Sequence, residues 1–229
     1  MKQLARSTQL VLLAIALVIS LPAAARKYPD VSEDGLTRVD SKRLDAVYWR
    51  DGATLAGYDK VMIGDVEVSF RKNWQRDQNS RRRGASDRIT ADDMTKIRAS
   101  VAEGFTEMFV KVLEEGGYVV VDQPGDDVLA LEPSIVDLDV RAPDISMRQP
   151  GMTRTYTTSA GEMTLNMALY DSGSNSQIGR VIDRRRAMER GQQLQWSSSI
   201  TNRQEANIMF RSWANALLDA LNEAKENQG

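Results

Sequence analysis

A strictly alternating stretch at residues 162–170 constrains the fold of this chain more than any other feature of the sequence. Every second side chain there is apolar, and these are Met163, Leu165, Met167 and Leu169. Because successive side chains of a β-strand point to opposite faces, the stretch predicts a strand with one buried face. A polar run at 171–176 and a second apolar stretch through Ile178, Val181 and Ile182 follow it. This order predicts an antiparallel hairpin.

Two amphipathic helices are predicted to cover the buried face of that sheet. Their apolar side chains recur at helical spacing: Ile97, Val101, Phe105, Met108 and Val112 in the first, and Phe210, Trp213, Leu217 and Leu221 in the second. Thr90 is the expected N-cap of the first helix, and Gly116 and Gly117 are expected to end it. The string Thr201–Gln204 predicts a capping box at the start of the second helix.

Three further strands are predicted, at residues 58–70, 118–122 and 129–140. Gly64 interrupts the first strand and indicates a bulge. Alternation in the third predicts two faces, one with Ile135, Asp137 and Asp139 and the other with Val136, Leu138 and Val140. A long helix joins the first two strands, which favours a parallel crossover. The predicted fold class is therefore α+β: a two-layer sandwich in which a mixed, mostly antiparallel sheet carries two long helices on one face.

The first 25 residues have the organisation of a secretory signal peptide. Lys2 and Arg6 precede an apolar run at 10–21, and the small side chains of Ala23 and Ala25 suit cleavage after Ala25. The run is shorter than the roughly 20 residues of a membrane-spanning helix, and an uncleaved anchor is the alternative. We therefore expect a periplasmic protein with no transmembrane segment in its mature chain. The expected organisation is a signal peptide at 1–25, an extended N-terminal arm at 26–57 and a single α+β domain at 58–229.

The chain contains no cysteine and no histidine, which removes most catalytic chemistry. It has no thiolate nucleophile, no disulfide, no cysteine-type zinc site and no imidazole base. Two catalytic alternatives survive, a Ser–Lys pair at Ser41 and Lys42 and a carboxylate pair that includes Asp126 and Asp127. We interpret the first as chance adjacency and the second as a solvated turn. We therefore predict that the protein is not an enzyme and uses no cofactor or metal.

Two arginine clusters are the candidate functional residues. Those predicted to bind anions are Arg81, Arg82, Arg83, Arg184 and Arg186. A guanidinium group binds phosphate in bidentate geometry, so the clusters predict an anion-binding surface. On an extended strand Arg185 points away from its two neighbours, which splits the second cluster. The alternative is a solvated loop and strand whose charge is balanced by Asp183 and Glu189.

Nucleic acid is not an expected partner. Removal of the leader, with Lys2 and Arg6, lowers the basic residues from 30 to 28 against 32 acidic ones, which leaves a net charge of −4. An acidic, exported protein lacks the basic balance of nucleic-acid-binding domains.

Several strings together resemble a known bacterial family. They are GYDKV at 57–61, VEVSF at 66–70, LEPSIVDLDVRAP at 131–143, the segment 161–172 and RVIDR at 180–184. The family is a domain of unknown function that contains periplasmic lipoproteins, and it brings no established activity, cofactor or catalytic residue. This chain lacks the cysteine of a lipobox, so we expect no lipid anchor. The order of elements is also similar to small periplasmic modules of transport-auxiliary lipoproteins and Tol-system proteins.

The sequence thus predicts a non-catalytic periplasmic module that binds an envelope protein, in envelope assembly or transport. The alternative prediction is a binder of anionic lipid or glycan that uses the basic loops.

Overall fold

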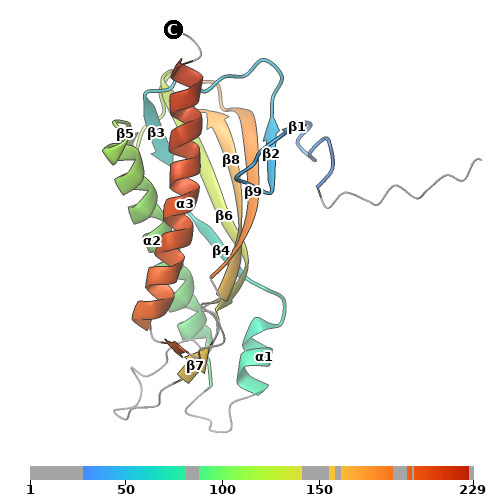
Figure 1. Cartoon of the computed structure of the whole chain (residues 1–229), viewed down its shortest axis with the longest axis vertical. Helices are drawn as coiled ribbons and strands as arrows, with labels where there is room; N and C mark the ends of the chain where they lie inside the picture. Colours follow the sequence, from blue (N-terminus) through green and yellow to red (C-terminus); the bar gives the residue numbers. More distant parts are fainter. Residues whose placement is uncertain are drawn as a thin grey trace, which may run out of the picture.

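The predicted hairpin lies at the centre of a large mixed sheet (Figure 1). The structure is a computed structural model that describes residues 28–80, 88–140, 155–157, 161–187, 195–197 and 199–226. The predicted signal peptide lies outside these residues. The elements in chain order are β1 (Thr37–Val39), β2 (Ala46–Trp49), β3 (Lys60–Ile63), β4 (Glu67–Phe70), α1 (Trp74–Ser80), α2 (Ala91–Glu115), β5 (Val119–Val121), β6 (Val128–Val140), β7 (Thr155–Thr157), β8 (Gly161–Asp171), β9 (Ser176–Arg186), β10 (Gln195–Ser197) and α3 (Ser199–Glu226).

The main sheet has eight strands in the order β1-β2-β9-β8-β6-β3-β5, and β4 also pairs with β6. Strand β3 is parallel to β5 and to β6, and β4 is parallel to β6, whereas the other pairs of this sheet are antiparallel. The parallel pairing of β3 with β5 confirms the predicted crossover. Strands β7 and β10 form a separate antiparallel pair. The arrangement confirms the predicted fold class, a mixed and mostly antiparallel sheet with helices on one face.

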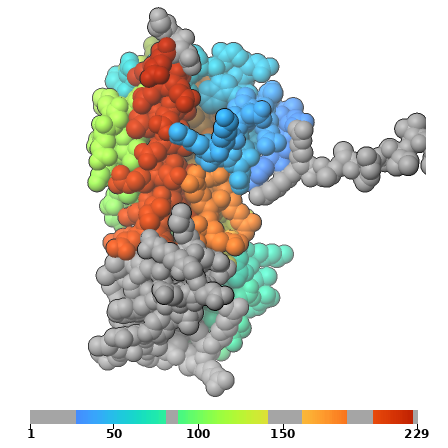
Figure 2. All heavy atoms as spheres, in the orientation of Figure 1, coloured from blue at the N-terminus to red at the C-terminus, as the bar shows by residue number. Residues whose placement is uncertain are grey.

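Helices α2 and α3 lie side by side on one face of the sheet (Figure 1), and Figure 2 shows α3 running along this face of the molecule. They run in the same direction, because Gly104 lies against Phe210 and, further along both helices, Gly116 lies against Leu218. The predicted apolar stripes meet between the layers. Phe105 contacts the ring of Phe210 edge-on, with ring centroids 5.7 Å apart, and both side chains are buried.

The ends of the helices test the capping predictions. The Thr90 hydroxyl accepts a hydrogen bond from the Asp93 N–H at 3.3 Å, and the Asp93 carboxylate accepts one from the Thr90 N–H at 2.8 Å. This capping box confirms the predicted start of α2, and Gly117, with φ 87°, follows its end. The capping box predicted at Thr201 is wrong, because α3 is already helical from Ser199. No helix within the described ranges is long and apolar enough to cross a membrane.

The strand predicted at 58–70 is two strands, β3 and β4, which pair with successive parts of β6. They separate at Gly64, whose N–H donates to the Leu131 carbonyl at 2.9 Å. Alternate residues of a strand turn their backbone groups to the same neighbour, so Pro133 turns its ring nitrogen toward this gap. Proline has no N–H to donate. The predicted strand therefore breaks where β6 offers no donor to continue the ladder.

The faces predicted for the third strand are wrong at Ile135. Both Ile135 and Leu138 are buried in the core, although simple alternation places them on opposite faces. Asp137 adopts a left-handed backbone conformation, with φ 53°, and the pairing of β6 with β8 shifts between Val136 and Asp139. This bulge adds one residue to β6, so the inward parity changes after it.

Part of the segment predicted as an extended arm belongs to the sheet. Strand β2 pairs antiparallel with β9, and β1 pairs with β2. Leu36, Ala46 and Tyr48 form a second, small core, against which Tyr28 and Ile182 pack. Since Ile182 lies opposite Ala46 in register, the N-terminal segment covers apolar side chains at this edge of the sheet. The structure differs from the predicted arm because burial of this small core holds the segment in place.

Candidate functional site

The predicted arginine pair on β9 is held by one carboxylate of β8. Arg184 and Arg186 share a face of the strand, as alternation predicts, and both contact Glu162. Their Nη2 atoms lie 2.5 Å and 3.0 Å from the Glu162 Oε1 and Oε2 atoms, respectively. The Glu162 side chain is 16% exposed, whereas the two arginine side chains are about half exposed. Two cations thus share the Glu162 carboxylate, and the nearby carboxylate of Asp137 balances the charge of Arg184 further.

The ionisation of Glu162 follows from these contacts. Burial alone would raise the pKa of its carboxyl group, but the hydrogen bonds from Arg184 and Arg186 outweigh burial, and the pKa is lowered. Glu162 therefore remains a carboxylate at neutral pH. The carboxylate holds the side chains of Arg184 and Arg186 in place. An anionic ligand would have to bind the exposed sides of their guanidinium groups.

Arg185 points to the other face, as predicted, and joins a buried polar network. Its Nε donates to the Asp183 carboxylate at 2.7 Å, and its Nη1 donates to the Ser212 hydroxyl at 2.5 Å. Asp183 is 4% exposed and also accepts hydrogen bonds from the Trp213 indole at 2.7 Å and the Asp45 N–H at 2.9 Å. The network joins α3, β9 and the segment before β2, and no ligand is needed to satisfy it.

The acidic partner found for Arg185 is one that the sequence predicted, whereas the partner found for Arg184 and Arg186 is not. Asp183 pairs with Arg185, as the alternative interpretation requires. Glu162 pairs with Arg184 and Arg186, whereas the predicted partner Glu189 lies outside the described residues. Sequence reasoning missed Glu162 because it lies far along the chain and becomes a neighbour only through the register of β8 with β9.

The first predicted cluster, Arg81 to Arg83, lies in a segment that the structure does not describe. Its flanking residues are described, and three exposed cations are among them: Lys72, Arg76 and Arg88. The two ends of the segment are tied together by Asn79. Its Nδ2 donates to the Ile89 carbonyl at 3.0 Å, and its Oδ1 accepts from the Ile89 N–H at 2.7 Å. The described residues on the two sides of the segment are therefore held together.

Helix α1 is fixed to the sheet at the same end of the molecule. The Trp74 ring stacks on Phe70 with centroids 4.3 Å apart, and its indole donates to the Val140 carbonyl at 3.1 Å. Arg71 lies between two carboxylates, with nitrogens 2.8 Å from oxygens of Asp77 and of Asp139. Hydrogen bonds from Arg71 and then from Arg76 of α1 lower the pKa of Asp77. Only cations that remain outside such pairs are available for a ligand.

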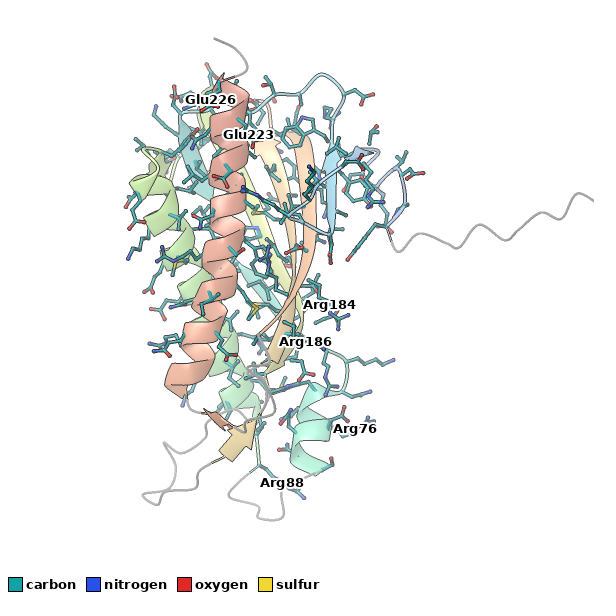
Figure 3. All side chains as sticks on the ribbon, in the orientation of Figure 1. Arg76, Arg88, Arg184, Arg186, Glu223 and Glu226 are labelled. Carbon is teal, nitrogen blue, oxygen red and sulfur yellow. The ribbon has the colours of Figure 1, made fainter. Side chains whose placement is uncertain are left out.

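The exposed charges at the two ends of the molecule differ, although Asp92 lies at the first end and Arg50 near the second. Figure 3 shows Arg76 and Arg88 toward one end and Glu223 and Glu226 at the other. Exposed carboxylates at the second end that make no ion pair with any described residue are Glu114, Asp122, Asp126, Glu223 and Glu226. Helices α2 and α3 both begin at the basic end and finish at the acidic end (Figure 1), so their dipoles add to this difference.

The edge of the sheet at the acidic end is open. Strand β5 is the last strand, and its one neighbour among the described residues is β3. The Val119 side chain is 55% exposed. Sequence reasoning predicted the strand but missed the edge, because its position depends on the order of strands in the sheet. The signal in the sequence is the run of three valines between Gly117 and Asp122.

Residues of the two catalytic alternatives make structural contacts with their neighbours. The Ser41 hydroxyl accepts hydrogen bonds from the backbone N–H groups of Arg43 and Leu44, so it caps a turn. Asp127 forms an ion pair with Lys60 at 2.8 Å. Within the part of the chain that the structure describes, no three metal-ligating side chains come together.

Three solved structures show a distant likeness to this chain. A PelC dodecamer from Paraburkholderia phytofirmans is 11% identical, with a TM-score of 0.34, over 72% of this chain and 96% of that chain. A minor lipoprotein from Acinetobacter baumannii is 11% identical, with a TM-score of 0.31, over 71% and 91%. A neuraminyllactose-binding hemagglutinin homolog from Helicobacter pylori is 11% identical, with a TM-score of 0.33, over 83% and 94%. Likeness at this level transfers no ligand or partner.

Comparison with curated proteins finds no match to this chain. The family described as "Protein of unknown function (DUF3313)" matches residues 27–217. The match extends from before β1 into α3 and so includes every strand of the main sheet. It confirms the resemblance to a domain of unknown function, and the chain belongs to the DUF3313 family.

Proposed function

We propose that this protein is a non-catalytic periplasmic module that binds another protein of the cell envelope, in envelope assembly or transport. The observation that carries the proposal is the open edge of β5, where the sheet ends in an exposed valine side chain. An open strand edge is a template for pairing with an extended segment of another chain. The helix layer supports the proposal, because the hydroxyl of Tyr118, next to β5, donates to the Asn222 side chain of α3 at 3.3 Å and ties this edge to the helices.

Two features of the sequence support the rest of the proposal. The predicted signal peptide supports the periplasm as the compartment. The lack of cysteine and histidine supports binding over catalysis, since the common nucleophiles and proton shuttles are missing.

The proposal is tested by recovery of the partner from native cells. The tagged protein is crosslinked mildly in the intact envelope, purified and analysed by mass spectrometry, with an unrelated tagged periplasmic protein as the control. The proposal predicts one reproducible envelope protein that the control does not recover. Recovery of the same proteins with both baits, or of no protein, would contradict it.

A second candidate function is the binding of an anionic lipid or glycan at the basic end. The observation in its favour is that Lys72 and Arg88, which form no ion pair with any described residue, are exposed on either side of the Arg81–Arg83 segment, and that Asn79 joins the described residues on its two sides. Phosphate or carboxylate groups would be bound by guanidinium groups there.

Vesicles test this second candidate. Binding to phosphatidylglycerol vesicles is compared with binding to phosphatidylcholine vesicles, for the natural protein and for a variant with Arg81, Arg82 and Arg83 all changed to Glu. A matched control changes Lys96 of α2 to Glu. The candidate predicts binding to the anionic vesicles that weakens with salt and is lost in the triple variant. Equal binding by the triple variant, or binding unchanged in high salt, would remove it.

A further inference from the structure

We infer that the open edge of β5 binds an extended, basic segment of a partner protein as an added β-strand. The inference rests on the proposed function and names the chemistry of the partner. Three observations carry it: the direction of the free backbone groups, the lack of protection on the edge and the charge around it.

The backbone of Val120 faces away from the sheet. Val119 pairs with Lys60 of β3, and its N–H donates to the Asp59 carbonyl at 3.4 Å. Because successive residues of a strand turn their N–H and C=O groups to opposite sides, the groups of Val120 point to the open side. One donor and one acceptor are thus available there to an incoming strand.

Apart from its shortness, at three residues, the edge lacks the devices that usually protect an edge strand. Strand β5 is Val-Val-Val, with no lysine, no proline and no bulge to prevent pairing. Val120 lies opposite Val61 in register, and Val61 is buried in the core. Val120 therefore points toward the helices, and Val119 points to the other face, where it is exposed. An added strand gains apolar contact as well as backbone hydrogen bonds.

Acidic side chains outnumber basic ones around the edge, since the neighbouring cations Lys60 and Lys225 are paired with Asp127 and Asp59. Glu114 and Glu115 precede the strand and Asp122 follows it, and all three are exposed. The lysine at position 111 lies 3.9 Å from Glu115, and no ion pair to Glu114 or Asp122 is found among the described residues. The last turn of α2 contains no basic residue, so the negative end of its dipole adds to the field. A basic segment is the complementary partner.

A second copy of this chain is a poorer occupant. A two-fold pairing of β5 with β5 would bring the acidic ends of both copies together. Glu114, Glu115 and Asp122 of one copy would then lie near this set of acidic residues in the other copy. Like charges oppose such contact. Charge complementarity therefore favours a different protein.

The test uses a synthetic peptide of alternating lysine and valine as the probe, and binding is measured by fluorescence anisotropy. A fully N-methylated peptide of the same sequence keeps the charge but cannot form the strand hydrogen bonds. A serine–valine peptide keeps the strand-forming backbone but removes the charge. We expect each change to weaken binding by about tenfold, because the first removes the strand hydrogen bonds and the second removes the charge attraction.

Three protein variants locate the site. Val119→Lys adds a positive charge at the β5 edge, and Val39→Lys adds the same charge to an exposed valine of β1, at the other side of the sheet. We expect the first to weaken peptide binding by about tenfold and the second to leave it unchanged. Val120→Pro, which removes the outward N–H, is expected to act like the first variant if circular dichroism shows that it is folded.

The outcomes separate this inference from the proposed function. Equal binding of the N-methylated peptide, equal effects of Val119→Lys and Val39→Lys, or no binding of the lysine–valine peptide would overturn the edge inference. If the partner is still captured from cells by the Val119→Lys protein, the proposed function stands and the edge inference fails. If the natural protein captures no partner, the proposed function fails.

Discussion

Glu162 of β8 lies directly opposite Arg186 of β9, and its carboxylate binds Arg184 of the same strand face as well. One acidic side chain thus positions both arginines that the sequence singles out on this strand. The relationship explains how two guanidinium groups are kept close together on one face of the sheet.

Replacement of this carboxylate should lower stability in a pH-dependent way. At neutral pH we expect Glu162→Gln to reduce the free energy of unfolding by about 1 kcal/mol, because both arginines are about half exposed and solvent screens the pairs. The pKa of Glu162 is lowered in the folded protein, so its contribution is present above the unfolded pKa and is lost as the pH falls through the folded pKa. Urea unfolding from pH 7 to pH 3 measures the difference.

Glu67→Gln is the matched control for this prediction. Glu67 is an exposed residue of β4 and makes no ion pair with any described residue. We expect the control to match the natural protein at every pH. A Glu162→Gln effect that persists unchanged at pH 3 would show that the carboxylate is not the cause.

The buried network around Asp183 should be the most sensitive polar site in the protein. Asp183→Ala leaves the Trp213 indole and the Asp45 N–H without their acceptor and Arg185 without its counter-ion. We expect a loss of about 3 kcal/mol or more in the free energy of unfolding. Ser212→Ala removes only one hydrogen bond of the network and is expected to cost about 1 kcal/mol. Similar unfolding midpoints for the two variants would contradict the account.

Gly161 should tolerate no side chain. Its φ is 146°, which side chains rarely allow, and a Cβ there would lie 2.1 Å from the Asp139 carbonyl oxygen. We expect Gly161→Ala to cost about 2 kcal/mol or more. At Gly57 a Cβ would meet open space, so Gly57→Ala should stay within about 0.5 kcal/mol of the natural protein. Thermal melts that rank the two variants equally would show that the start of β8 is not constrained in this way.

The buried Tyr58 should ionise well above the ordinary pKa of a phenol. Burial, and then its hydrogen bond to Asp171 at 3.0 Å, raise the pKa of Tyr58 to about 12. The difference in tyrosinate absorbance between the natural protein and Tyr58→Phe should therefore titrate near pH 12 in the folded state. In denaturant it should titrate near the ordinary value of about 10.

The same shift sets a stability window. Because the folded pKa is raised, the contribution of Tyr58 is complete below about pH 10 and is lost as the pH rises through about 12. At neutral pH we expect Tyr58→Phe to be less stable by about 1 kcal/mol, from the lost hydrogen bond. The gap should narrow above pH 10, and a constant gap up to pH 12 would contradict the assignment.

The sequence predicts those elements of the fold whose pattern is local. The alternation of Met163 to Leu169 and the stripe of Phe210 and Trp213 each repeat within one element, so a single buried face fixes both. The bulge at Asp137 could not be read in this way. It depends on the pairing of β6 with β8, which brings together residues far apart in the chain.

The same limit applies to the candidate site. The shared face of Arg184 and Arg186 follows from strand alternation, but their partner Glu162 follows only from register. The strand at 119–121 follows from its valines, but its position at the edge follows from the strand order of the whole sheet. Partners and edges are set by long-range pairing, which local patterns do not encode.

The central claim is that the β5 edge is where this module meets another protein. A photo-crosslinking amino acid placed at Val119 tests it in intact cells, with the same group at Ile208 of α3 as the control. The two side chains are equally accessible, 55% and 57% exposed, but only Val119 lies at the open edge. We predict a discrete adduct with one envelope protein from position 119 and none from position 208. No adduct from position 119, or the same adduct from both positions, would contradict the claim.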